Sequence, residues 1–175
     1  MYQKYKQNIS KRAFYSYVAI LAVLSLVLIV WIAIPYTVGF DEQFIEKLAN
    51  ASQNQNKEQA KYEIIASGKL AAFLSYIANS FTLLFFLFYI TMARHRLTVG
   101  YGFYVSWIII FVTLIAMPFY QGTERHVPIA LGIGGLITGL SSLMVLALLI
   151  NLFQYYVQRK AHYYEWYKIH IGKAR

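Results

Sequence analysis

Four long stretches of this chain contain no Lys, Arg, Asp or Glu, and this feature limits the possible folds more than any other. They are residues 13–40, 70–93, 97–123 and 127–158. An α-helix rises about 1.5 Å per residue, so about 20 apolar residues cross the hydrocarbon core of a bilayer. Each stretch is long enough to do so. The sequence therefore predicts an all-α fold, a polytopic membrane protein built as a four-transmembrane-helix bundle.

The spans leave no room for a separate soluble domain. We expect them at residues 13–34, 70–92, 98–120 and 129–155, within a single membrane domain of residues 1–175. The longest segment outside them is the loop of residues 35–69, which is shorter than the roughly 40 residues below which independent folding usually needs disulfides or metal. The chain has no cysteine, which excludes disulfides and thiolate metal sites.

The distribution of charge predicts the orientation. With the amino terminus inside, four crossings place 11 of the 16 Lys and Arg residues on the inner side, whereas six of the seven acids lie outside. The positive-inside rule favours this arrangement. We therefore expect a bacterial cytoplasmic (inner) membrane location with both termini cytoplasmic. The net charge of +9 is then explained by topology and by attraction to anionic membrane lipids, and no nucleic acid partner is expected.

The long outer loop carries its own helical signals. Asp41 is a candidate N-cap for a short amphipathic helix over residues 41–50, and a second helical segment from Lys57 is expected to run into the second span. Residues 52–56 are predicted to form a turn between them. Pro35 is expected to end the first helix.

Loop lengths predict how the helices are connected in space. The connections at residues 94–100 and 121–128 are short, so the second, third and fourth helices should form a compact series of hairpins. The longer first loop would leave the first helix free to pack elsewhere.

The C-terminal tail, residues 156–175, is predicted to prolong the fourth helix as a cytoplasmic amphipathic extension. Aromatic residues recur there at helical spacing with basic residues between them. Such a helix can anchor at the membrane surface or dock on a partner protein, and both alternatives stay open. The residues expected to make these contacts are Arg159, Lys160, Tyr163, Trp166, Tyr167 and Lys168.

The fourth span begins with the sequence LGIGGLITGLSS, which places small residues on one helical face. These are Gly132, Gly135, Gly139 and Ser142. Small residues let two helix backbones approach closely in a membrane, where lipid offers little hydrophobic drive for association. We expect this face to pack against another helix, first of all within the bundle, and otherwise in another subunit.

The second span carries a weakly polar stripe of Ser75, Asn79 and Thr82. An amide inside a membrane should face protein, because an unsatisfied polar group in hydrocarbon is costly. We expect Asn79 to form an interhelical hydrogen bond. A sharper alternative is a pore that these residues line together with Ser106 and Thr113.

Groups that usually carry chemistry are missing from the spans. The four histidines lie outside them, and the only aspartate is Asp41 in the outer loop. Haem ligation by paired intramembrane histidines and catalysis by paired intramembrane aspartates are therefore excluded. We expect no enzymatic activity, no cofactor and no metal site.

Three functions fit this pattern. The first is a non-enzymatic small membrane subunit or accessory protein that binds other membrane-protein subunits or itself, and the second is a homo-oligomeric channel or transporter. The third follows from the layout, with both ends inside and the first outer loop the longest, which is similar to that of the four-span immunity proteins that protect bacteria from pore-forming colicins. That resemblance implies that the last three helices bind the hydrophobic hairpin of a toxin.

Overall fold

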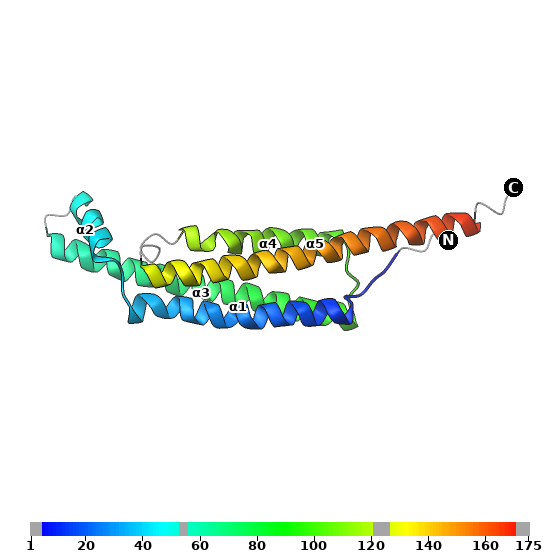
Figure 1. Cartoon of the computed structure of the whole chain (residues 1–175), viewed down its shortest axis with the longest axis horizontal. Helices are drawn as coiled ribbons and strands as arrows, with labels where there is room; N and C mark the ends of the chain where they lie inside the picture. The colour runs from blue at the N-terminus through cyan, green and yellow to red at the C-terminus, as the bar shows by residue number, and fades with distance from the viewer. Residues whose placement is uncertain (1–4, 53–55, 121–126, 171–175) are drawn as a thin grey trace.

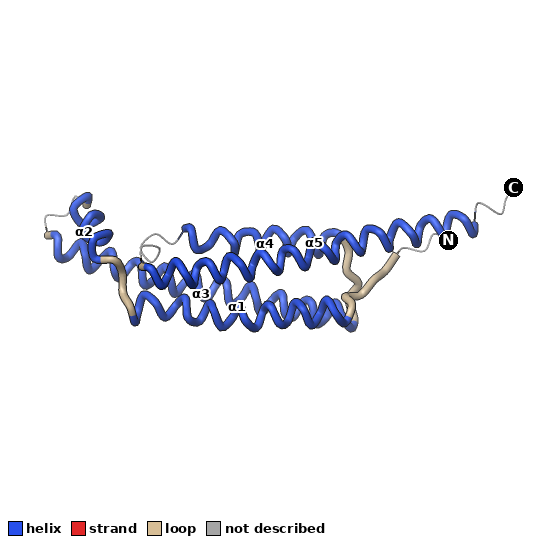
Figure 2. Tube along the Cα trace, viewed as in Figure 1, coloured by secondary structure: helices blue, strands red, loops and turns tan. Residues whose placement is uncertain are grey.

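The computed structural model describes residues 5–52, 56–120 and 127–170. Within these ranges the chain is all-helical (Figures 1 and 2), with the elements α1 (Lys11–Thr37), α2 (Glu42–Ala51), α3 (Lys57–His95), α4 (Tyr101–Tyr120) and α5 (Pro128–His170). All of them except α2 are long and apolar enough to cross a membrane. The predicted all-α fold with four candidate spans is confirmed, and the architecture is that of a multi-pass membrane protein.

The first helix lies at the centre of the packing. α1 packs against both α3 and α5, and α5 also packs against α4 (Figure 1). The expectation that α1 is free to pack elsewhere is therefore wrong. The long connection after α1 extends its reach, but a line of large residues at three- and four-residue steps holds it in the bundle: Tyr17, Leu21, Leu24, Leu28 and Trp31 are all buried.

Aromatic rings fill the space between α3 and α4. The ring of Phe86 on α3 lies 4.6 Å from that of Trp107 and 5.1 Å from that of Phe111, both on α4, and 5.8 Å from that of Tyr17 on α1. These distances are typical of favourable aromatic pairs. α3 and α4 touch through these large side chains, but their backbones do not pack closely, so this pair does not form the compact hairpin that the short connection predicts.

The first helix passes through Pro35 and ends at Thr37, beyond the expected boundary. A proline costs a helix one backbone donor but does not prevent another turn. The end is set at Gly39, whose φ of 86° lies in the left-handed region that glycine tolerates. The N–H groups of Val38 and Gly39 both donate to the carbonyl of Ile34, at 2.9 and 3.1 Å.

A helical hairpin extends beyond the bundle at one end, which we call the α2 end (Figure 1). Asp41 caps α2 as expected, accepting from the N–H groups of Gln43 and Phe44, and α3 begins at Lys57 as expected. α2 packs on α3, and the Lys61 ammonium lies 2.9 Å from the Glu46 carboxylate. The centre of the predicted turn at 52–56, residues 53–55, lies outside the described residues, as does most of the 121–128 connection.

The segment before α1 is held at the opposite end. The N–H of Ile9 donates to the carbonyl of Ala93 at the end of α3, and the N–H of Val99 donates to the carbonyl of Gln7 at 2.8 Å. The Tyr5 hydroxyl donates to Gln158 Oε1 of α5 at 3.1 Å. Figure 2 shows this segment and the α3–α4 connection converging. We call this the basic end, because it carries Lys11, Arg12, Arg94, Arg96 and Arg159.

Candidate functional site

The predicted small-residue face of α5 points away from the bundle. Gly132, Gly135 and Gly139 are exposed, and a methyl group added to any of them would meet no atom within 4 Å. Ser142 is exposed as well, and its hydroxyl donates to the carbonyl of Thr138 at 2.7 Å. The expectation that this face packs within the bundle is therefore wrong. A second line of residues on a different face of α5 packs against the bundle instead, so the face that carries Gly132, Gly135 and Gly139 stays open.

The closely packed glycine of α5 is Gly134. A Cβ at this position would lie 3.0 Å from Cβ of Pro118 and 3.3 Å from Cζ3 of Trp31. Gly134 shares its face with Ala130 and Ser141, which are also buried. Sequence reasoning missed this line, although its spacing of four and seven residues is as helical as that of the exposed one.

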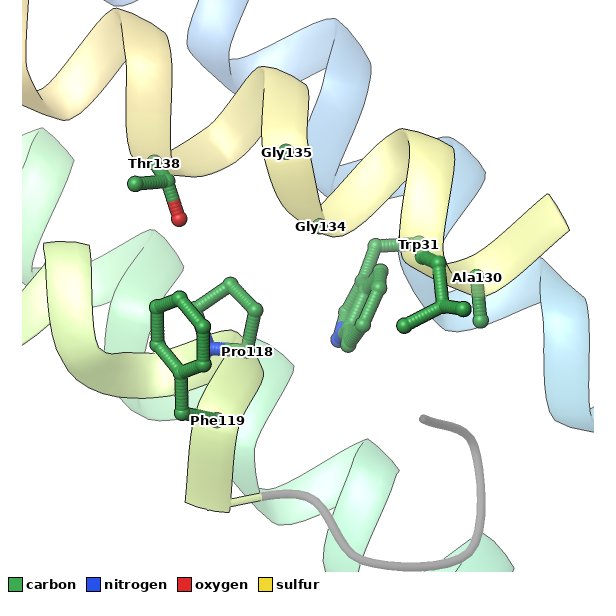
Figure 3. Close-up of a pocket in the computed structure, with 8 residues that line it drawn as sticks. Trp31, Pro118, Phe119, Ala130, Gly134, Gly135 and Thr138 are labelled. Atoms are coloured by element: carbon green, nitrogen blue, oxygen red, sulfur yellow. The ribbon is translucent and has the colours of Figure 1, made fainter. Parts of the chain in front are cut away.

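A small pocket lies beside Gly134, between α1, α4 and α5 near the α2 end. Its volume is about 190 Å³, and Figure 3 shows the Trp31 indole and the Pro118 ring flanking it below the helix that carries Gly134 and Gly135. Thr138 contributes the nearest hydroxyl, which donates to the carbonyl of Ile115 at 3.3 Å. No lining residue carries an ionisable side chain. The pocket therefore accommodates apolar groups and offers no acid or base for catalysis.

The polar stripe of α3 acts as a link between helices. The Asn79 amide donates to Sδ of Met117 on α4 at 2.6 Å and to Oγ of Ser75 at 3.2 Å. Thr82 donates to the carbonyl of Ala78 within its own helix. The interhelical contact expected of Asn79 is present, with a methionine sulfur as the acceptor.

The residues proposed to line a pore do not converge within one copy of the chain. Ser106 and Thr113 lie on the exposed side of α4, and the Thr113 hydroxyl donates to the carbonyl of Ile110 at 2.7 Å. Asn79 instead donates a hydrogen bond to Met117 on α4. These five residues form no common lining in the part of the chain described.

The predicted tail contacts divide into two groups. The Arg159 guanidinium lies over the rings of Tyr101 and Tyr163, at 4.9 and 5.5 Å, and Trp166 is half-buried. The remaining members of the set are exposed: Lys160, Tyr167 and Lys168. The first turns of the α5 extension are therefore held by the bundle and by Tyr5. The later turns are available to lipid or to a partner.

No group of three His, Asp or Glu side chains among residues 5–52, 56–120 and 127–170 is placed to hold a metal ion. Comparison with known proteins matches the chain to no family model, no curated protein and no solved structure.

Proposed function

We propose that this protein is a non-enzymatic membrane subunit that binds a transmembrane helix of another subunit through the open face of α5. The bound helix belongs either to a second copy of the chain or to a different membrane protein. One observation carries the proposal: Gly132, Gly135 and Gly139 leave the α5 backbone uncovered, with open space where side chains would stand. Uncovered backbone in a membrane helix permits close van der Waals contact with a neighbour.

The pattern of α5 extends this face along the helix. Beyond Ser142, the exposed residues Leu146, Leu149 and Phe153 continue the alternating steps of three and four. Alternating steps of three and four keep one line of side chains in contact with a partner helix when the two helices wind around each other in a left-handed supercoil. The small residues of this face lie near the α2 end and the large ones toward the basic end. A partner helix can therefore approach the α5 backbone most closely beside the glycines.

The charge distribution supports a bacterial cytoplasmic membrane with both termini on the cytoplasmic side. The segment before α1, the α3–α4 connection and the α5 extension all lie at the basic end, whereas α2 and its acids lie at the other (Figure 1). Under the positive-inside rule the basic end faces the cytoplasm.

Site-specific photocrosslinking in native membranes tests the association. A photoreactive amino acid replaces Leu143, which is 54% exposed beside the glycine face, or Leu26 on α1, which is 64% exposed and serves as the control. We expect an adduct of defined mass from position 143 only. An adduct of about twice 20.2 kDa identifies a homodimer, and any other mass identifies a different subunit.

A second substitution tests the role of the glycines themselves. Gly139→Leu combined with the probe at Leu143 should lower the adduct yield several-fold, because the added side chain keeps the backbones apart. Val112→Leu on the exposed side of α4 should leave the yield unchanged. Equal adducts from positions 143 and 26, or none from 143, contradict the proposal.

A further inference from the structure

A groove runs along the membrane-facing surface where α1 and α3 meet. Its volume is about 300 Å³, and most of its lining is apolar. α1 contributes Val18, Leu21, Ala22, Ser25 and Ile29, and α3 contributes Tyr76, Ser80, Leu83, Leu84 and Leu87. Three lining residues carry hydroxyls, Ser25 on α1 and Tyr76 and Ser80 on α3, and that of Ser25 donates to the carbonyl of Leu21 in its own helix. The groove therefore suits a hydrocarbon chain.

Toward the basic end, the same faces of both helices end in cations. Arg94 follows Leu87 by seven residues, and Lys11 precedes Val18 by seven, so each cation lies two helical turns from the groove on the groove-lining face. Seven residues of helix correspond to about 10 Å. That distance matches the separation between a phospholipid phosphate and the upper part of its acyl chains.

Aromatic rings hold the Arg94 side chain in place. Its guanidinium carbon lies 4.8 Å above the ring of Phe14 and 5.3 Å above that of Tyr15, both on α1. A cation–π contact engages the charge of the guanidinium, and the in-plane N–H donors that do not point at the rings can bind an anion. In-plane donors match the paired oxygens of a phosphate.

At the basic end, neither helix supplies an acid to neutralise these cations. Residues 1–40 and 64–123 contain no Asp or Glu, and Glu165, the one acid expected on this side, belongs to α5. The cluster of Lys11, Arg94 and their neighbours therefore complements a negative charge brought by a ligand.

We propose that the α1–α3 surface binds one anionic glycerophospholipid, with its phosphate between Arg94 and Lys11 and an acyl chain in the groove. The apolar groove and the cation cluster lie on one line, as the two ends of such a molecule require. This site is on a different surface from the glycine face of α5, so it does not depend on the proposed association.

Native mass spectrometry of the full chain in mild detergent tests the site, with phosphatidylglycerol and phosphatidylcholine of identical chains added separately. We expect one phosphatidylglycerol per chain to bind in preference to phosphatidylcholine. Arg94→Gln should lower the bound fraction about tenfold, because a charge-assisted hydrogen bond is lost. Arg96→Gln, which removes the same charge two residues away on an exposed side chain, should change it less than twofold.

Two further pairs keep the test valid if Arg94→Gln does not fold. Lys11→Gln should weaken binding, whereas Arg12→Gln, on the neighbouring face, should not; both side chains are exposed, so the fold tolerates both changes. Ala22→Phe should fill the groove and expel the chain, whereas Leu26→Phe outside the groove should have no effect. The proposal is overturned if both variants of a pair lose the same amount of lipid binding, or if the two lipids bind equally. Either result would indicate general attraction of lipid to a basic surface.

Discussion

Single residues in α5 show how differently adjacent positions of one helix are used. Gly134 is held between Pro118 and Trp31, whereas Gly135, the next residue, would meet nothing if it gained a methyl group. In a soluble protein, polarity would distinguish the inner face from the outer one. In a membrane helix both faces are apolar, so spacing alone cannot say which line of small residues meets a neighbour.

These two glycines make a matched stability test. Gly134→Ala should destabilise the bundle by about 1–3 kcal/mol, since the new Cβ is forced against a proline ring that cannot move aside. Gly135→Ala should leave stability unchanged or raise it by up to about 1 kcal/mol, because alanine is the better helix former. Thermal unfolding in one detergent compares them. Equal melting temperatures for the two variants would contradict the packing around Gly134.

What the sequence could predict at this scale follows from the chemistry of each residue. Asp41 was identifiable as a cap because its carboxylate precedes an amphipathic run, and Asn79 as a link between helices because a lone amide in hydrocarbon needs a partner. That its partner is the sulfur of Met117 could not be predicted, because methionine carries no pattern that marks it as an acceptor. The sequence predicts the line of glycines on one face of α5, but it does not predict that this face points away from the bundle.

Individual elements were the most predictable part of the molecule. Gaps in charge located four helices, and the start of α3 near Lys57 followed from the polar segment before it. α1 ends later than Pro35 predicts, because the helix makes a further turn after the proline and Gly39 sets the end. How α1 packs was also missed, since loop length limits where a helix can reach and not which neighbours its buried face selects.

The attachment of α2 to α3 should depend on pH. The Lys61 ammonium holds the pKa of Glu46 below its ordinary value of 4.5 through a hydrogen bond and charge attraction. Because the pKa of Glu46 is lower in the folded chain than in the unfolded one, its ion pair contributes fully to stability above pH 4.5. This contribution is lost as the pH falls through the lowered pKa. The protection factors of the α2 amides, which express hydrogen exchange relative to the intrinsic chemical rate at each pH, should therefore fall as the pH drops below 4.5.

Matched variants identify the source of that change. Lys61→Gln should lessen the fall in these protection factors, because Glu46 then loses the cation that lowers its pKa. Lys57→Gln, at the start of α3 and exposed, should retain the full fall. If exchange in the Lys61→Gln protein responds to acid as the unmodified chain does, the ion pair is not the cause.

For the whole molecule, the segment before α1 joins parts that are distant in sequence. Ile9 is 5% exposed and bonds to the end of α3, Gln7 pairs with Val99 before α4, and Tyr5 reaches α5. We call these contacts of residues 5–9 the closure of the basic end. The sequence does not predict the closure, since a short polar tail with scattered aromatic residues has no periodic pattern. Its contacts are specified only once the helices have brought their ends together.

Ile9→Ala tests this closure. Removing a buried isoleucine side chain typically costs about 2–5 kcal/mol, and here the loss should appear as opening of the basic end. Limited proteolysis should cut the connection at residues 96–100 faster than in the unmodified chain. Asn8→Ala removes a weaker, exposed contact of 3.4 Å to Arg94 and should leave the cleavage rate close to that of the unmodified chain. Equal rates for Ile9→Ala and the unmodified chain would show that the segment does not secure this end.

The lengths of α3 and α5 have a mechanical consequence. With 39 and 43 residues, they measure about 58 and 65 Å, roughly twice the hydrocarbon thickness. α3 extends beyond the bundle at the α2 end and α5 at the basic end, and α1 packs against both (Figure 1). Because α1 contacts both long helices, a displacement of the hairpin at one end would be passed through α1 to the aromatic extension at the other.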